Sequence, residues 1–312
     1  MGGGLAGPEL VANVSESGCF GVLGTGGLPP EIVGRLIKET KQLTCKPFGA
    51  NIILPMSDGR DIASCFDEGV EVLVLFWGDP QPFIKDAHKR GVFLAIQCGN
   101  VEEAVYAASC GADAIIIQGT EAGGHVKGEI ELQSYITETR RELRKTPLIA
   151  AGGIDSGEKI ATLIKQKVQA VSLGTRFVAS AEARAATRYK EKIVSSSGGD
   201  TVLTNLYDVG WKNAKHRVIK TPLYESWHQN GCLGEGDRTA EGRTIGQIEL
   251  GSNRTISVPK YSVFPPVSNF TGDEDELPFY AGKSVDGVHK IEGTRTIIET
   301  LVGEIKSHLD EK

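Results

Sequence analysis

Short apolar runs alternate with segments of helical periodicity between residues 19 and 177, and no other feature of the sequence limits the fold as strongly. The apolar runs are continuous, which indicates strands buried on both faces, as in a parallel sheet covered by helices. We expect strands at residues 19–24, 48–54, 70–77, 92–98, 113–118, 147–151 and 170–177. We expect helices between them at residues 30–43, 60–68, 82–89, 101–109, 133–143 and 156–167.

Two folds contain such a sheet, the open doubly wound sheet and the TIM (β/α)8 barrel. Glycines and polar side chains follow most of the expected strands. In a barrel all of these strand ends meet on one face, whereas a doubly wound sheet brings ligand residues to one switch point. The first Gly-rich turn, Gly24-Thr-Gly26-Gly27, continues as Leu-Pro-Pro and lacks the GxGxxG pattern of a dinucleotide fold. The sequence therefore favours the barrel.

The expected strands are one short of a complete barrel. The missing strand is the first one, because residues 8–17 have the pattern of a helix that precedes the strand at 19–24. We therefore predict a TIM (β/α)8 barrel over residues 1–195 whose first strand is missing or truncated.

The character of the sequence changes near residue 195, where a run rich in Gly, Asn and Pro begins and carries scattered aromatic residues. This run is too apolar for a disordered tail. We predict that residues 196–312 form a C-terminal extension, with a lid over the barrel mouth at 201–280 and a closing helix at 294–308. A structural flap without substrate contact is the alternative that the sequence leaves open.

Charge and composition argue against several classes of partner. The net charge is −6 and no basic cluster contains interleaved aromatic residues, which argues against nucleic acid. No apolar run approaches the roughly 20 residues that span a bilayer, and the first residues lack the pattern of a signal peptide. The six cysteines are scattered and include no CxxC pair, a pattern that fits neither a zinc site nor a dense disulfide framework. We expect a cytoplasmic protein with reduced thiols, and the oligomeric state stays open.

The stretch from Gln118 to His125 carries the most informative residues. It reads Gln-Gly-Thr-Glu-Ala-Gly-Gly-His and follows the apolar run at 114–117. Glycines let backbone N–H groups approach a ligand closely, and a histidine after a strand titrates near neutral pH and can move a proton. His125 is therefore a candidate catalytic base, and a histidine that only hydrogen-bonds its neighbours is the alternative.

The loops after the last two expected strands have the pattern of a phosphate site. Barrels often hold a phosphate at these two loops with backbone amides and a helix N-terminus. Gly152 and Gly153 leave the amides of one loop uncovered, and Thr175 adds a hydroxyl in the other. Arg176 is either a further phosphate ligand or the ion-pair partner of Glu182.

The expected positions of the polar residues limit the ligand. Asn51, Gln97 and Gln118 follow other strands and can hydrogen-bond the edges of a ring. A flat ring rich in heteroatoms with a phosphate tail suits this arrangement, and FMN is the most economical choice. A sugar phosphate is the rival ligand, but it would usually require a catalytic lysine or paired carboxylates.

Several motifs of the chain resemble the nitronate monooxygenase family, once called 2-nitropropane dioxygenases. They are Gln118-Gly-Thr-Glu-Ala-Gly-Gly-His125, Ala150-Ala-Gly-Gly-Ile154, Leu173-Gly-Thr-Arg-Phe177, Pro47-Phe-Gly-Ala-Asn51 and Tyr280-Ala-Gly-Lys-Ser284. The resemblance covers nearly the whole chain. It implies an FMN enzyme on a (β/α)8 barrel with an added domain. Such an enzyme oxidises alkyl nitronates, for example propionate 3-nitronate, with O2 and without a metal, to a carbonyl compound and nitrite.

The resemblance also implies roles for individual residues. His125 matches the catalytic base, which takes the α-proton of a neutral nitroalkane or holds the nitronate anion. The positions that match FMN contacts are Asn51, Gln118, Gly123, Gly152, Gly153, Ser172, Leu173, Gly174 and Thr175. Gln97 stands where some members of the family have a lysine.

Three other interpretations remain open at the level of the sequence. An FMN-dependent NAD(P)H enoyl-thioester or quinone reductase of the same fold shares the EAGGH-type string. A non-redox phosphate-binding barrel, such as an isomerase, predicts a colourless protein. A non-catalytic remnant that lacks its first strand predicts weak or absent flavin binding.

Overall fold

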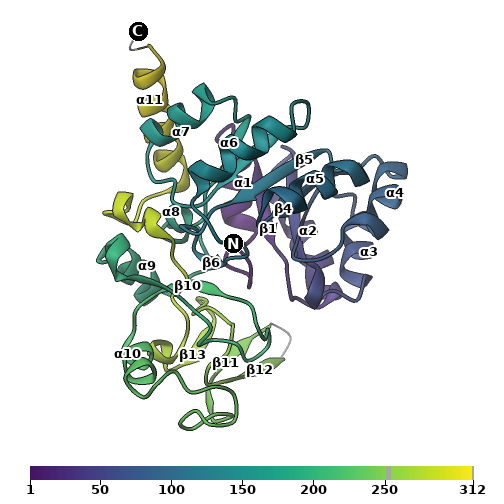
Figure 1. The fold of residues 1–312 in the computed structure, drawn as a ribbon. Helices are drawn as coiled ribbons and strands as arrows, with labels where there is room; N and C mark the ends of the chain where they lie inside the picture. Colours follow the sequence, from purple (N-terminus) through teal and green to yellow (C-terminus); the bar gives the residue numbers. More distant parts are fainter. Residues whose placement is uncertain (251–253, 311–312) are drawn as a thin grey trace.

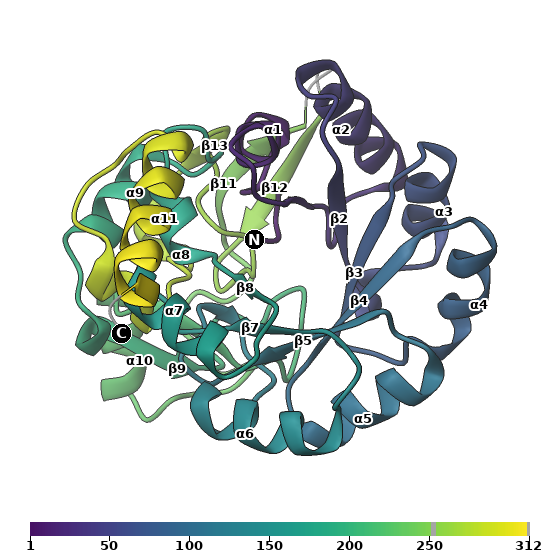
Figure 2. The same ribbon diagram turned by 90° about the horizontal axis from the view of Figure 1, so that it is seen from above.

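A computed structural model describes residues 1–250 and 254–310 of the chain, and its centre is a curled parallel sheet (Figures 1 and 2). The sheet has seven strands in the order β1-β2-β3-β4-β5-β7-β8, so neighbours in the sequence are neighbours in space. The strands are β1 (Gly21–Gly24), β2 (Phe48–Ile53), β3 (Val72–Phe76), β4 (Phe93–Cys98), β5 (Ala114–Gln118), β7 (Leu148–Ala151) and β8 (Ala170–Ser172). The predicted TIM-barrel type of fold is confirmed.

Helices cover the outer face of the curled sheet (Figure 2). They are α1 (Pro8–Glu16), α2 (Pro30–Leu43), α3 (Arg60–Asp67), α4 (Gln81–Lys89), α5 (Val101–Cys110), α6 (Leu132–Glu142) and α7 (Gly157–Lys165). Side-chain caps fix two of their starts: Asn100 accepts a hydrogen bond from Glu103 N–H at 2.8 Å, and Ser156 accepts one from Lys159 N–H at 3.3 Å. The helices that the periodicity predicts between the strands are all present.

The two faces of the sheet bury different side chains. The outer face packs large aliphatic residues such as Leu73, Leu94 and Ile115 against the helices. The inner face carries a separate small cluster of Val74, Ala95, Ala114, Ile116 and Ala151. Because these inner side chains are mostly short, they do not fill the interior, and space remains at the carboxyl ends of the strands.

The place of a further strand beside β1 is taken by the first residues of the described chain. Residues 1–6 form turns, with Gly4 N–H donating to Gly24 O at 3.2 Å and Gly24 N–H donating to Ala6 O at 3.0 Å. On their other side, Leu5 O accepts from Arg184 N–H at 3.0 Å. In the described residues a turn segment thus connects β1 to the chain that follows β8.

The last predicted strand is too long. The strand β8 ends at Ser172, and a short helix, α8 (Thr175–Val178), begins where the sequence predicted strand up to residue 177. The apolar residues of this segment, Phe177 and Val178, are buried in helical conformation, so burial alone did not distinguish the two structures.

The C-terminal extension lies at the carboxyl ends of the barrel strands, below the barrel in Figure 1. It contributes five strands to two small antiparallel sheets, ordered β6-β10-β9 and β12-β11-β13, and β6 comes from the barrel part of the chain. Their strands are β6 (Gly124–His125), β9 (Thr201–Thr204), β10 (His216–Ile219), β11 (Thr244–Glu249), β12 (Thr255–Pro259) and β13 (Phe270–Gly272). The other helices are α9 (Thr187–Val194), α10 (Pro222–Gln229) and α11 (Thr294–Asp310).

The final helix returns to the barrel. It packs against α7 and α1, away from the sheets of the extension (Figure 1). The predicted helix at 294–308 is therefore present, but it covers the outer wall of the barrel. In the described ranges, no helix has the length and the apolar character needed to cross a bilayer.

Candidate active site

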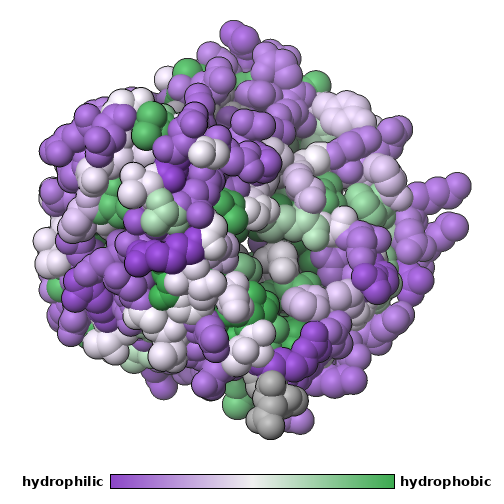
Figure 3. Space-filling model, turned by 90° about the horizontal axis from the view of Figure 1, so that it is seen from below, coloured by the Kyte–Doolittle hydropathy of each residue, from purple (hydrophilic) through white to green (hydrophobic). Residues whose placement is uncertain are grey.

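A cavity of about 590 Å³ lies at the carboxyl ends of the barrel strands, between barrel and extension. Figure 3, seen from the side of the extension, shows the molecule hollowed near its centre, with hydrophobic residues around the hollow and mostly hydrophilic residues at the periphery. All of the site residues predicted from the sequence line this cavity: Asn51, Gln118, Gly123, His125, Gly152, Gly153, Ser172, Leu173, Gly174 and Thr175. Their roles toward a ligand stay predictions.

His125 belongs to β6, a two-residue strand that joins the barrel to the extension. It pairs with His216 of β10, and its ring stacks on the Trp211 ring with a centroid distance of 4.1 Å and an angle of 28°. Its Nε2 atom is buried and forms no hydrogen bond with any described residue. A buried ring nitrogen without a partner is an available site for a ligand atom.

The ionisation of His125 differs from the expectation drawn from the sequence. Burial, with His216 nearby, lowers its pKa to about 3, so the ring is neutral and does not titrate near neutral pH. His216 is also neutral, because burial lowers its pKa to about 4. Its Nε2 accepts from Tyr207 N–H at 3.2 Å, which leaves Nδ1 to donate to Ala214 O at 2.9 Å.

The other residues of the Gln118–His125 stretch hold His125 in place. Gln118 is buried, and its amide donates to His125 O at 3.1 Å and accepts from Lys127 N–H at 3.2 Å. Glu121 accepts from Leu132 N–H at the start of α6. Gly123 lies against residues 281–282, where an added Cβ would be 2.3 Å from Gly282 N. Much of the motif is therefore needed to build the loop that presents the histidine.

Aromatic side chains form the wall of the cavity around His125. Trp211 and Tyr280 both come from the extension and lie 4.1 and 5.5 Å from the His125 ring, measured between centroids. Trp77, just after β3, contacts Trp211 edge-on at 5.0 Å and adopts a backbone φ of 63°. The sequence showed these aromatic residues but not their places, because chain segments far apart in sequence meet only in the fold.

Uncovered backbone groups form another part of the cavity lining. Gly152 and Gly153 have φ values of 114° and 67°, which side chains rarely adopt, and Gly174 precedes the first turn of α8. No described residue accepts a hydrogen bond from the Gly153 or Gly174 N–H groups. Thr175 Oγ1 accepts from Gly282 N–H at 3.0 Å and keeps its own proton for donation.

Amide side chains lie at the ends of the neighbouring strands. Asn51 Nδ2 donates to Val74 O at 3.1 Å, and Thr25 Oγ1 donates to Asn51 O at 2.7 Å. Asn51 and Gln97 both line the cavity. In the described ranges, no group of three or more His, Cys, Asp or Glu side chains has the geometry of a metal site.

Arg176 does not pair with Glu182 and does not line the cavity. Its guanidinium is buried and pairs with Glu292, and it also donates to Lys290 O at 3.3 Å. Glu182, the partner expected from the sequence, instead accepts from the N–H and hydroxyl groups of Thr294 at 3.0 and 2.7 Å. Both residues thus hold the chain that leads into α11. The sequence missed this because the partners are separated by more than a hundred residues.

The fold and the site define a barrel with a large ligand cavity at its carboxyl face and a histidine on a glycine-rich loop. The family model described as nitronate monooxygenase matches residues 1–71 and 59–304. The chain therefore belongs to the nitronate monooxygenase family, and this prediction is confirmed. It is a family of oxidoreductases.

Individual relatives differ in the activity that their names state. A Rhodococcus jostii RHA1 protein named (3aS,4S,5R,7aS)-5-hydroxy-7a-methyl-1-oxo-octahydro-1H-indene-4-carboxyl-CoA dehydrogenase is 31% identical over 74% of this chain. The match spans 64% of that relative's length. A probable nitronate monooxygenase of Bacillus subtilis is 28% identical over 66% of this chain and 72% of its own length.

Solved structures agree on the fold. FabK from Thermotoga maritima superposes with a TM-score of 0.82 at 30% identity, covering 100% of this chain and 93% of that one. Nitroalkane oxidase from Streptomyces ansochromogenes has a TM-score of 0.79 at 22% identity, covering 99% of this chain and 94% of that one. At that identity the second match supports the fold alone.

Proposed function

We propose that the protein is an FMN-dependent nitronate monooxygenase that oxidises alkyl nitronates with O2 to a carbonyl compound and nitrite. The observation that carries the proposal is the Nε2 of a neutral His125, which has no partner among the described residues and lies in a cavity that uncovered backbone N–H groups also line. Membership of the nitronate monooxygenase family supports the same activity.

The residues present fit FMN. Gly153, Gly174 and Thr175 offer N–H and hydroxyl donors for a phosphate, and the glycines leave room for it to approach. Asn51, Gln97 and Gln118 place amide groups along the cavity, which suits the heteroatoms of a flavin ring. The volume of about 590 Å³ lies within the roughly 300–1,000 Å³ of small-molecule sites. When bound, FMN supplies the transfer of electrons from substrate to O2.

The neutral His125 ring has a defined task in this site. Its free lone pair can accept the α-proton of a neutral nitroalkane, and its N–H form can donate to an oxygen of a nitronate. Proton transfer places an imidazolium next to the nitronate that forms, and this pairing offsets the burial that lowers the histidine pKa. Gln118 holds the backbone at His125 and at Lys127, two residues further along the chain.

A second candidate is reduction of an enoyl thioester or a quinone by NAD(P)H. It is favoured by the 31% identical relative, whose name states an acyl-CoA substrate. Visible spectra of the anaerobic protein with FMN distinguish the two. Bleaching of the flavin by 1-butyl nitronate but not by NADPH is expected from the monooxygenase. Bleaching by NADPH alone would replace the proposal with the reductase, and the absence of FMN binding would contradict both.

A further inference from the structure

Every described residue that lines the cavity has an uncharged side chain at neutral pH. No Asp, Glu, Lys or Arg belongs to its wall among residues 1–250 and 254–310, and His125 is neutral. Trp211 and Tyr280 lie against the His125 ring, and Phe76 and Phe264 also line the cavity. A ligand in this part of the cavity meets a low-polarity surface.

Three charged side chains of the segments around His125 already have partners of their own. Arg217 donates to Thr120 O at 2.8 and 3.0 Å, and the carboxylate of Glu121 accepts from Leu132 N–H. Lys127 pairs with Glu103 at 2.5 Å. None of these groups is free to neutralise a charge on the tail of a substrate.

One delocalised anion still has partners in the site. The nitronate group can accept from His125 or from the uncovered backbone N–H groups, as anions do at such sites. For a second anion at the other end of the molecule, the described lining offers no charged side chain as a partner. An unpaired buried charge is strongly unfavourable.

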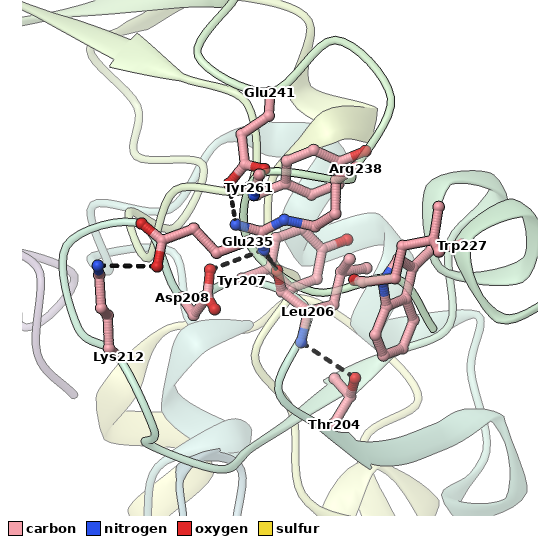
Figure 4. Close-up of polar contacts among 12 residues, drawn as sticks. Thr204, Leu206, Tyr207, Asp208, Lys212, Trp227, Glu235, Arg238, Glu241 and Tyr261 are labelled. Carbon is pink, nitrogen blue, oxygen red and sulfur yellow. Dashed lines mark hydrogen bonds and ion pairs between the residues drawn. The ribbon is translucent and has the colours of Figure 1, made fainter. Parts of the chain in front are cut away.

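Trp211 is positioned to form this apolar wall. Only 8% of its surface is exposed, and it lies between His125 and Trp77. The backbone N–H of Trp211 donates to Asp208 O at 3.0 Å. The buried Arg238 in turn donates to the Asp208 carboxylate at 2.7 Å and to Leu206 O at 2.9 Å (Figure 4). The Arg238 guanidinium also lies 4.5 Å from the centre of the Tyr261 ring. The loop that carries Trp211 is therefore firmly anchored in the extension.

Resting on the proposed function, we infer that the site selects nitronates whose tail is uncharged and apolar, and that Trp211 sets this selection. The class of substrate is an alkyl nitronate with an aliphatic tail rather than a carboxylate-bearing one such as propionate 3-nitronate. Trp211 acts as a specificity-determining residue because it closes the wall that the tail contacts.

Two isosteric nitronates test the inference in the FMN-loaded protein. Propionate 3-nitronate and 3-methylbutyl nitronate differ only in a carboxylate replaced by an isopropyl group of the same shape. We expect kcat/KM to be about 100-fold higher for 3-methylbutyl nitronate, because a site without a partner for a polar group discriminates by this order. Equal values, or a preference for propionate 3-nitronate, would overturn the inference while leaving the monooxygenase activity intact.

Binding of unreactive mimics separates this inference from the proposed function. In 4-methylpentanoate and succinate a carboxylate replaces the nitronate group, and the two acids differ by the same isopropyl-for-carboxylate exchange. Tryptophan fluorescence, measured on the protein with and without FMN, is expected to report tighter binding of 4-methylpentanoate by at least roughly 10-fold. This result does not depend on turnover. Equal affinities, or no binding of either acid, would contradict the inference.

Matched tryptophan variants assign the selection to Trp211. Trp211→Leu opens the wall to water, and the preference for the apolar member of each pair is expected to shrink to a few-fold. Trp227→Leu is the control, since Trp227 lies outside the cavity wall and donates to Leu233 O. A Trp211→Leu protein that keeps the full preference would show that Trp211 has no such role. If that variant does not fold, Trp211→Phe and its fluorescence titration provide the same comparison.

Discussion

His125 combines two properties at the scale of a single residue: no residue of the described ranges hydrogen-bonds its Nε2, and its ring is neutral. We predict that His125→Gln lowers kcat/KM for a neutral nitroalkane by roughly 10²–10⁴-fold, because glutamine cannot accept the α-proton. The loss for the preformed nitronate is expected to be smaller, since that substrate has no proton to give. Oxygen consumption with nitrobutane and with butyl nitronate measures both values. Equal losses on the two substrates would argue against the base role.

The same residue determines how the rate depends on pH. Because the pKa of His125 is about 3, its ring stays neutral from pH 8 to pH 5. The wild-type kcat/KM for the nitroalkane is therefore expected to show no acidic limb with a midpoint near 6.5. If kcat/KM does fall with a midpoint near pH 6.5, and this fall is absent in His125→Gln, the ring titrates as an exposed histidine does.

His216 links the same kind of burial to stability. Its pKa is about 4 in the folded chain and about 6.5 when unfolded, so the unfolded state binds the extra proton between these values. Stability is then full above pH 6.5 and is lost as the pH falls toward 4. From pH 7.5 to 5 the loss attributable to His216 is about 2 kcal/mol. In urea unfolding, the free energy of unfolding of His216→Asn is expected to fall by that much less than the wild-type value between pH 7.5 and 5. An unchanged fall would contradict the assignment.

What the sequence revealed about single residues followed from local chemistry. His125 and the glycines of its loop could be located because they follow an apolar strand, and they do line the cavity. The depressed pKa of His125 could not be foreseen, because it arises from burial beside Trp211 and His216 of the extension. The pairing of Arg176 with Glu292 was missed because it also joins segments that are far apart in the sequence.

At the scale of helices and strands, periodicity succeeded where elements were long. Helix α2 has the predicted bounds, and the parallel strands lie within their predicted ranges. The strands β6 and β9–β13 were not predicted, since each spans between two and six residues in segments rich in turns. Such short strands depend on partners from distant segments, which a local pattern does not contain.

The contact between α7 and α11 permits a prediction at this scale. Gly157 starts α7, and an added Cβ there would lie 2.3 Å from Glu304 Cβ and 2.6 Å from Leu301 O. We expect Gly157→Ala to displace α11 and to lower the free energy of unfolding by about 1–3 kcal/mol. Gly303→Ala is the control, since a Cβ at this position in α11 meets no atom within 4 Å. That change should instead stabilise by roughly 0.5–1 kcal/mol, and chemical denaturation of both variants measures the contrast.

At the scale of the whole molecule, barrel and extension share one cavity. The sequence predicted that the extension covers the barrel mouth, and residues such as Trp211, Phe264 and Tyr280 do contribute to the wall. The seven parallel strands alone leave the inner cluster of short side chains open on that side. A ligand bound between the two parts is expected to stabilise the folded molecule as a whole, because it binds the native state and not the unfolded chain.

FMN at 100 times its Kd should therefore raise the free energy of unfolding by about 2.7 kcal/mol, and the melting temperature should rise with it. Gly174 tests which loop holds the phosphate. Its φ of −113° is open to other residues, and a Cβ would meet only Met1 Cγ at 3.7 Å, so Gly174→Asp should fold normally without FMN. Its carboxylate would repel the phosphate, and the shift in melting temperature is expected to disappear. Gly174→Asn has the same shape without the charge and should keep most of the shift. If both variants respond to FMN as the wild type does, the phosphate does not bind at this loop.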